Sequence, residues 1–145
     1  MMGVKKINGQ FNNFVCAGDT IRDNVNGWGV RVSVLHDSDY HIDDDDMHSE
    51  NQALTGLNEE AHKSLMAART SWFRNDWFYG GVSVSIYREG VELAEQSIWG
   101  VEVNYPNSNN EYLMELANEL LEECFTEAHH KIEKLSAFAT QQEIQ

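Results

Sequence analysis

The chain has 145 residues, of which 24 are acidic and 10 are basic, and its formal net charge is −14. This charge argues against direct contact with nucleic acid or with an anionic membrane, because both select basic surfaces. A hydrophobic fraction of 41% that includes four Trp, five Tyr and six Phe residues argues against intrinsic disorder. No apolar segment approaches the roughly 20 residues of a membrane span. A signal peptide would have an apolar segment after basic residues such as Lys5 and Lys6, and no such segment follows them. We therefore expect a cytoplasmic protein.

The length favours a single domain over residues 1–145, which begins with an irregular arm over residues 1–27. Residues 28–36 alternate between apolar and polar side chains, which predicts a half-buried strand. Residues 37–57 have no periodic pattern, because acids and histidines interrupt every apolar stretch. We therefore expect a long exposed loop after the first strand.

A first helix is predicted to begin after Asn58, whose side chain suits the N-cap position, and to end near Asn75. Two strands are predicted next, at residues 77–88 and 91–103. Glu89 and Gly90 lie between them and are predicted to form a hairpin turn.

Ser108 and Glu111 match a capping box at the start of a second, longer helix. Apolar residues repeat there with the period of a helix from Leu113 to Leu135, which predicts one buried face and an end near Ser136. Residues 137–145 are expected to form a frayed tail. Together the elements predict an α+β domain, in which one long C-terminal amphipathic helix and a shorter helix pack on an antiparallel sheet of three or four strands.

The acidic side chains are concentrated in two parts of the chain that contain no Lys or Arg. Nine of them lie between Arg31 and Lys63, and ten lie between Arg88 and Lys131. Like charges placed close together destabilise a folded protein, and an ordinary solvent-facing helix would mix in lysines. Two interpretations remain open: the acids bind a cationic partner, or they serve solubility alone.

The candidate partner-binding residues are carboxylates of the predicted loop and of the outward side of the long helix. Residues four apart on a helix are neighbours, so the helical glutamates form a strip. The candidates are Asp37, Asp39, Asp43, Asp44, Asp45, Asp46 and Glu50 in the loop, and Glu111, Glu115, Glu119 and Glu122 on the helix.

The sequence contains no phosphate-binding loop, no G-x-S-x-G elbow and no recognisable Cys-His pair, so we expect no enzymatic activity and no cofactor. The stretch from Asp39 to Glu50 has the length of an EF-hand loop, but Asp44 stands where such a loop requires glycine. A metal site is therefore not expected there.

Aromatic residues gather around the end of the first helix and in the hairpin; they are Trp72, Phe73, Trp77, Phe78, Tyr79 and Trp99. They predict either a core where the helix meets the sheet or an exposed patch. An exposed patch would serve as a homodimer interface or as a pocket that stacks a nucleotide-like base.

Two stretches of the chain are distinctive: W-F-R-N-D-W-F-Y-G-G-V at residues 72–82, and S-I-W-G-V-E-V-N-Y-P-N-S-N-N-E-Y-L at residues 97–113. They resemble segments of an uncharacterised family of small acidic proteins encoded by phages, plasmids and integrated elements, and the likeness spans about residues 28–125. The resemblance implies a mobile-element context and assigns no catalytic residue. Such elements often encode acidic proteins that block host defence nucleases.

We therefore predict a non-enzymatic inhibitor or decoy that imitates the charge of DNA and binds a basic, nucleic-acid-handling host protein. The expected partner is a CRISPR effector or a restriction enzyme, so the function would be of the anti-CRISPR or anti-restriction type. One alternative is a small-ligand or metal-binding module that forms a homodimer. A second alternative is an accessory protein whose acidity serves only solubility.

Overall fold

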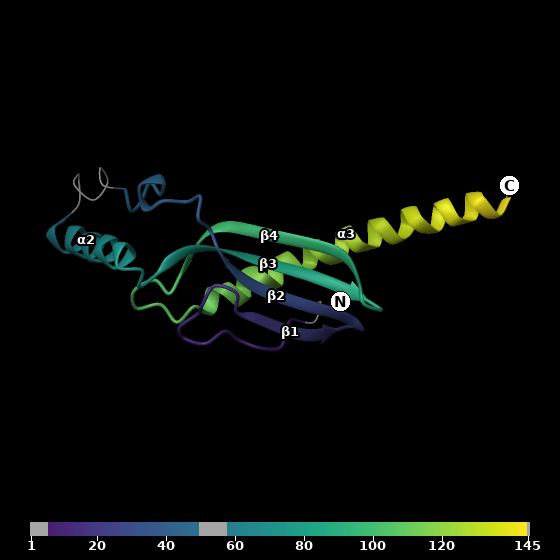
Figure 1. Ribbon diagram of the computed structural model, residues 1–145, viewed down its shortest axis with the longest axis horizontal. Coiled ribbons are helices and arrows are strands. Elements are labelled where there is room, and N and C mark those ends of the chain that lie inside the picture. Colours follow the sequence, from purple (N-terminus) through teal and green to yellow (C-terminus); the bar gives the residue numbers. More distant parts are fainter. Residues whose placement is uncertain (1–5, 50–57, 145) are drawn as a thin grey trace.

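The computed structural model describes residues 6–49 and 58–144 and contains one four-stranded sheet with two helices (Figure 1). The strands are β1 (Thr20–Val25), β2 (Trp28–His36), β3 (Phe78–Arg88) and β4 (Val91–Val103), and they pair in chain order, each antiparallel to the next. The helices are α2 (Glu59–Phe73) and α3 (Glu111–Ile144), and a 3-10 turn, η1, covers Ile42–Asp44. The predicted α+β class is confirmed.

The core lies between one face of the sheet and α3. The alternation in β2 places Val30, Val32 and Val34 on that face, where they pair with Ile86, Val84 and Val82 of β3. Burial of each such side chain contributes about 1.5–3 kcal/mol. In Figure 1, α3 crosses behind the sheet and no helix covers the strands in front, so the sheet has one buried and one open face.

The predicted hairpin turn is present between β3 and β4. Glu89 and Gly90 both have positive φ angles, 52° and 79°, as a two-residue turn of type I′ requires. Glycine adopts this conformation without strain, whereas Glu89 adopts it at some cost.

Helix α3 packs on the sheet along only part of its length. Leu113, Leu121 and Ala128 are fully buried, whereas Leu135 and Phe138 are 62% and 60% exposed. The prediction that Leu135 belongs to the core is therefore wrong. The helix also continues to Ile144, past Ser136, and Figure 1 shows it projecting beyond the sheet. The apolar period identifies the buried side of a helix, but it does not tell where the sheet ends.

The predicted capping box at the start of α3 is not formed. The Ser108 hydroxyl accepts a hydrogen bond from the Asn110 N–H, and the Asn109 side chain accepts one from the Glu111 N–H. Asn110 has a positive φ of 63° and is buried. Its side-chain amide donates a hydrogen bond to the backbone oxygen of Asn13. The turn before α3 is therefore fixed by asparagines.

The predicted N-terminal arm is not irregular throughout, because it contains the edge strand β1, and from Ile7 to Val15 it is bound to the rest of the molecule. The Ile7 N–H donates to the Asn118 side chain at 2.9 Å, and the Asn104 side chain bonds both the N–H and the carbonyl of Val15 at 2.8 Å. Both Ile7 and Val15 are buried in the main core. Within the described residues, no helix is at once long enough and apolar enough to cross a membrane.

Candidate functional site

The aspartate loop, defined here as residues 37–49, is largely exposed, as the sequence predicted, but two buried side chains anchor it to the protein. Residues 50–57 of the predicted loop lie outside the described residues. Ile42 is fully buried and His48 is 1% exposed. Ile42 forms a second small hydrophobic cluster with Trp77 and Tyr79, apart from the main core. A single isoleucine between polar neighbours leaves no periodic signal, so sequence reasoning missed this packing.

Asp45 is the centre of a hydrogen-bond network inside the aspartate loop. Its Oδ2 atom lies 2.8 Å from His48 Nδ1 and accepts a 2.8 Å hydrogen bond from the Tyr79 hydroxyl, and its Oδ1 atom accepts from the Met47 N–H. Burial alone would raise the pKa of Asp45, but the hydrogen bonds from Tyr79 and His48 outweigh burial and hold the pKa below its usual value. This carboxylate therefore has a structural role.

Asp43 fastens the same loop to α2. The Arg69 guanidinium donates from Nη1 to Asp43 Oδ1 at 2.7 Å and to the backbone oxygen of His48, also at 2.7 Å. Arg69 is nearly buried, so these bonds satisfy a charge that would otherwise be costly to remove from water. Asp43 and Asp45 are consequently committed to internal contacts.

The other acids of the aspartate loop divide into capping and exposed groups. Asp44 Oδ2 accepts a hydrogen bond from the His41 N–H, and Asp37 accepts one from the Gly100 N–H of β4. Asp39 and Asp46 are exposed, and their carboxylates make no side-chain hydrogen bond with the described residues. The predicted site residue Glu50 lies outside the described residues.

The glutamate face, defined as Glu111, Glu115, Glu119 and Glu122 of α3, is exposed along its whole length. Among residues 6–49 and 58–144, none of these four carboxylates forms an ion pair, whereas Glu127 pairs with Lys131 at 3.2 Å. Like-charge pairs four residues apart each destabilise a helix by roughly 0.2–0.5 kcal/mol. The glutamate face is therefore a negative surface without ion pairs to any described residue.

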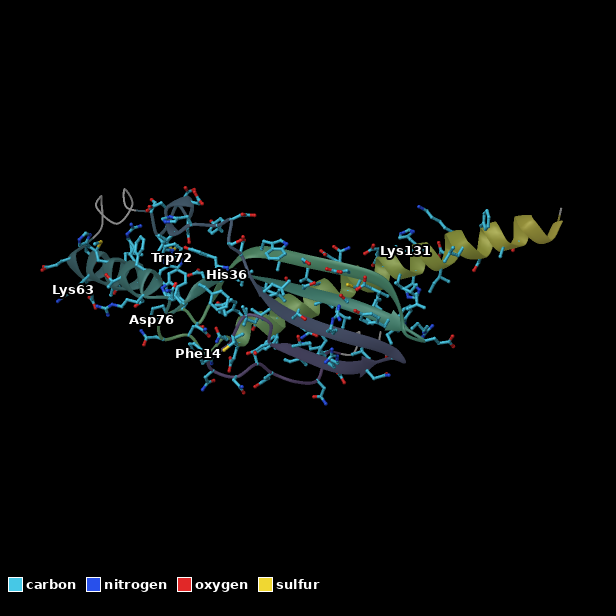
Figure 2. The ribbon with its side chains drawn as sticks, in the orientation of Figure 1. Phe14, His36, Lys63, Trp72, Asp76 and Lys131 are labelled. Carbon is cyan, nitrogen blue, oxygen red and sulfur yellow. The ribbon has the colours of Figure 1, made fainter. Side chains whose placement is uncertain are left out.

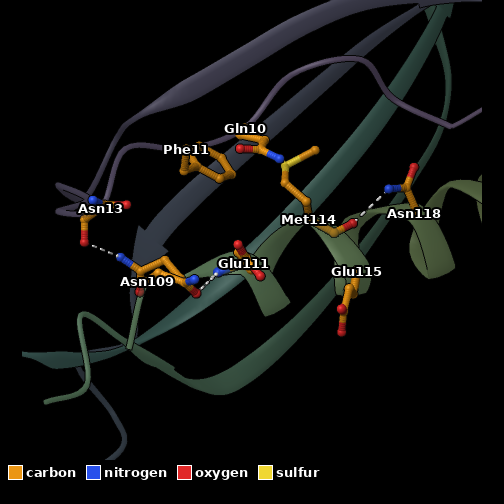
Figure 3. A pocket seen from close by; sticks show the side chains of 9 residues that line it. Gln10, Phe11, Asn13, Asn109, Glu111, Met114, Glu115 and Asn118 are labelled. Atoms are coloured by element: carbon orange, nitrogen blue, oxygen red, sulfur yellow. Dashed lines mark hydrogen bonds between the residues drawn. The ribbon is translucent and has the colours of Figure 1, made fainter. Parts of the chain in front are cut away.

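A polar groove of about 320 Å³ lies beside the first turns of α3 (Figure 3). Glu111 and Glu115 line it together with Met114 and with Gln10 and Asn13 of the arm. The glutamate face thus continues into a recess whose other polar groups are amides.

The structure brings the aspartate loop to the N-terminal end of α3. His48 Nε2 lies 2.7 Å from the hydroxyl of Tyr105, which belongs to the segment that leads into α3. The glutamate face begins at Glu111 and runs away from this contact along the helix. The two predicted acidic groups are neighbours at one end and do not merge into a single patch.

Beneath the aspartate loop lies a second cavity, of about 200 Å³, that sequence reasoning did not find. It is lined by Met47, His48, Glu102, Tyr105, Ser108 and Tyr112. These residues come from two distant parts of the chain, residues 47–48 and residues 102–112, so no local motif could identify them.

Two lining groups of this cavity lack partners among the described residues. The Glu102 carboxylate is half-buried and makes no hydrogen bond with the described residues, and burial raises its pKa. The Tyr112 hydroxyl is fully buried and likewise has no hydrogen-bond partner among the described residues. Burial also raises the pKa of Tyr105 and Tyr112, and the nearby Glu102 charge raises both further, so the phenols keep their protons.

The aromatic residues singled out in the sequence divide between core and surface. Trp77 and Tyr79 are fully buried, and the Trp77 indole donates a 2.9 Å hydrogen bond to the Ala68 carbonyl of α2. Phe73 is exposed, and Trp99 is 51% exposed on the open face of the sheet. Figure 2 shows Trp72 between α2 and the aspartate loop, where it packs on the second cluster.

Within the described parts of the chain, no three His, Cys, Asp or Glu side chains are grouped as metal ligands would be. The candidate surfaces are the glutamate face, the exposed acids of the aspartate loop and the cavity beneath that loop. Comparison with protein-family models, with curated proteins and with solved structures gives no match to this chain.

Proposed function

We propose that the protein is a non-enzymatic ligand of a positively charged protein surface, with the glutamate face as its main contact. The observation that carries this proposal is the exposure of Glu111, Glu115, Glu119 and Glu122 without a single ion pair among the described residues. A cationic partner would relieve the repulsion between these carboxylates, and solvent alone relieves it less.

The chemistry of the partner follows from the form of the negative surface. Successive glutamates four residues apart are about 6 Å apart along the helix axis, so they form a row of charges. Grooves that hold nucleic acid are positively charged and select such rows, although a duplex carries about one charge per 1.7 Å of axis. This supports a nucleic-acid-handling partner, and we propose a host defence protein of the CRISPR-effector or restriction-enzyme class.

Affinity capture from a host lysate tests the binding proposal. The wild-type chain is compared with a Glu115→Lys, Glu122→Lys variant and with a control, Asp76→Lys, Glu89→Lys, that changes the net charge equally at exposed sites elsewhere. We expect the wild type and the control to retain a basic protein at low salt and to release it at about 0.5 M NaCl, where the Debye length is below about 8 Å.

The charge-reversed variant is expected to capture nothing in that experiment. Equal capture by all three chains would overturn the proposal and leave solubility as the reason for the acidity. The proposal that the partner is a CRISPR effector or a restriction enzyme is tested by mixing the captured protein, its DNA substrate and the chain. Cleavage should fall in the presence of the wild type and persist with the charge-reversed variant.

A further inference from the structure

The cavity beneath the aspartate loop has mainly apolar walls with a few oxygen acceptors, and no Lys or Arg of the described residues lines it. It is bounded by Met47 and His48 of the loop, Glu102 of β4, Tyr105 and Ser108 of the following turn, and Tyr112 of α3. A ligand that donates hydrogen bonds and carries positive charge would complement this set.

The oxygen of Tyr105 is free to accept. The Asp45 carboxylate holds His48 at Nδ1, so in the neutral imidazole the proton lies on Nδ1 and Nε2 accepts the Tyr105 O–H. The hydroxyl proton of Tyr105 is thereby directed at His48, and the oxygen lone pairs remain for a donor in the cavity.

The Glu102 carboxylate supplies a second acceptor. It is half-buried, and among the described residues it accepts no hydrogen bond. Removing a carboxylate from water without a hydrogen bond is unfavourable, and a donor in the cavity would remove this cost.

We infer that this cavity binds a primary ammonium group, which donates to Glu102 and Tyr105 and keeps its third N–H toward solvent at the open side. An ammonium group presents three donors and no acceptor, which suits a carboxylate and a phenol oxygen. The cavity of about 200 Å³ corresponds to about seven water molecules at about 30 Å³ each, so the ligand is a short aliphatic amine or the end of a lysine side chain. Met47 and the tyrosine rings provide apolar walls for the alkyl part.

This inference does not rest on the proposed partner, because the cavity and the glutamate face use different residues. Titration of the full chain with n-butylammonium chloride at pH 7 and constant ionic strength, followed by NMR or calorimetry, tests it. We expect saturable binding of one equivalent, and at least tenfold weaker binding of n-butanol, which has the same shape without the charge. Butyltrimethylammonium, which has no N–H donor, is also expected to bind at least tenfold more weakly.

Three variants locate the site. Glu102→Gln is expected to weaken n-butylammonium binding at least tenfold, and Tyr105→Phe severalfold, because each removes one of the two acceptors of the cavity. Glu115→Gln removes an exposed carboxylate of α3 and should leave the affinity within twofold of wild type. The variant Glu115→Lys, Glu122→Lys should also retain most of the amine binding, even if it loses the basic partner.

Several outcomes overturn the inference. Equal binding of n-butanol or butyltrimethylammonium excludes recognition of a primary ammonium group. An equal loss in Glu102→Gln and Glu115→Gln indicates diffuse attraction to a negative protein, and the absence of saturation means that the cavity holds water only. If binding is found, N-acetyl-lysine methylamide distinguishes the source: affinity equal to n-butylammonium assigns a lysine side chain of a protein, and tenfold weaker affinity assigns a free amine.

Discussion

Asp45 and Glu102 both lie near His48, and their surroundings shift the pKa values of their carboxyl groups in opposite directions. Asp45 accepts hydrogen bonds from Tyr79 and Met47 and interacts with His48, so its pKa is lowered despite burial. Glu102 accepts none from the described residues, so burial raises its pKa. The Asp45 carboxylate stabilises the aspartate loop. The Glu102 carboxylate is half-buried at an unfavourable free energy, which a bound ligand would reduce.

This difference predicts opposite pH dependences for Asp45→Asn and Glu102→Gln. The folded pKa of Asp45 lies below its unfolded value, so its stabilisation is present above about pH 4 and is lost as the pH falls through the folded pKa. Asp45→Asn should therefore be less stable than wild type by about 1.5–3 kcal/mol at pH 7, a deficit that narrows below pH ~4. Urea unfolding between pH 3 and pH 7 measures the free energies.

The folded pKa of Glu102 lies above its unfolded value, so wild type loses stability as the pH rises through the folded pKa. Glu102→Gln should therefore be at least as stable as wild type at pH 7, and any advantage should vanish near pH ~4. The same unfolding series supplies this comparison. A Glu102→Gln variant that is markedly less stable than wild type at pH 7 would contradict the assignment of an unpartnered carboxylate.

At the scale of the elements, a small number of buried contacts hold α2 against the aspartate loop and the start of β3. Arg69 links it to the aspartate loop, and the Ala68 carbonyl accepts from the Trp77 indole just before β3. The pairing of β3 with β4 is irregular at one point, because the register shifts between Gly80 and Val82. At this point the Trp99 ring lies over Gly81, on the face opposite α3.

Gly81→Ala is expected to destabilise the β3–β4 pair by about 1–3 kcal/mol, as overpacking does. A Cβ atom at this position would approach the Trp99 ring to 2.4 Å, so the ring would have to move. In a Trp99→Ala background the same change should cost less than about 0.5 kcal/mol. A double-mutant cycle by thermal or urea unfolding measures the coupling, and additive effects would show that Trp99 does not hold this position.

At the scale of the whole molecule, charge is distributed unevenly between the two faces. The glutamate face lies on α3, behind the sheet, whereas Arg22 and Arg31 pair directly across β1 and β2 on the open face. Arg31 also lies 5.3 Å from the Tyr87 ring centroid. The open face also carries Glu92 and Glu95, which accept hydrogen bonds from Tyr87 and Ser83, so it mixes both charges, whereas the glutamate face is purely acidic.

The net charge of −14 predicts that salt stabilises the isolated protein. Raising NaCl from about 10 mM to about 150 mM shortens the Debye length from about 30 Å to about 8 Å, which screens the repulsion along α3. We expect the melting temperature to rise by a few degrees, and to rise less for Glu115→Lys, Glu122→Lys. Calorimetry at several NaCl concentrations measures this, and an unchanged melting temperature would indicate that the repulsion is already relieved in the folded chain.

The sequence predicts the regular elements well and the candidate site only in part. Alternation in β2 and the turn residues Glu89 and Gly90 act locally, so the strands and their hairpin could be predicted. The bond between His48 and Tyr105 joins residues 57 positions apart, and such a contact leaves no periodic trace. The acids of the aspartate loop looked alike in sequence, yet their roles depend on donors that only the fold supplies, such as Arg69 for Asp43.

The unsupported end of α3 has a consequence for the order in which the molecule opens. Beyond Ile132 the helix leaves the core, and an isolated helix of about 12 residues is only marginally stable in water. Its backbone hydrogen bonds persist because the docked part has already nucleated the helix, so each turn depends on the turn before it. Opening free energies should rise from near zero at Ile144 toward the global value at Ala128, and the helix should unwind from its free end while the sheet stays closed.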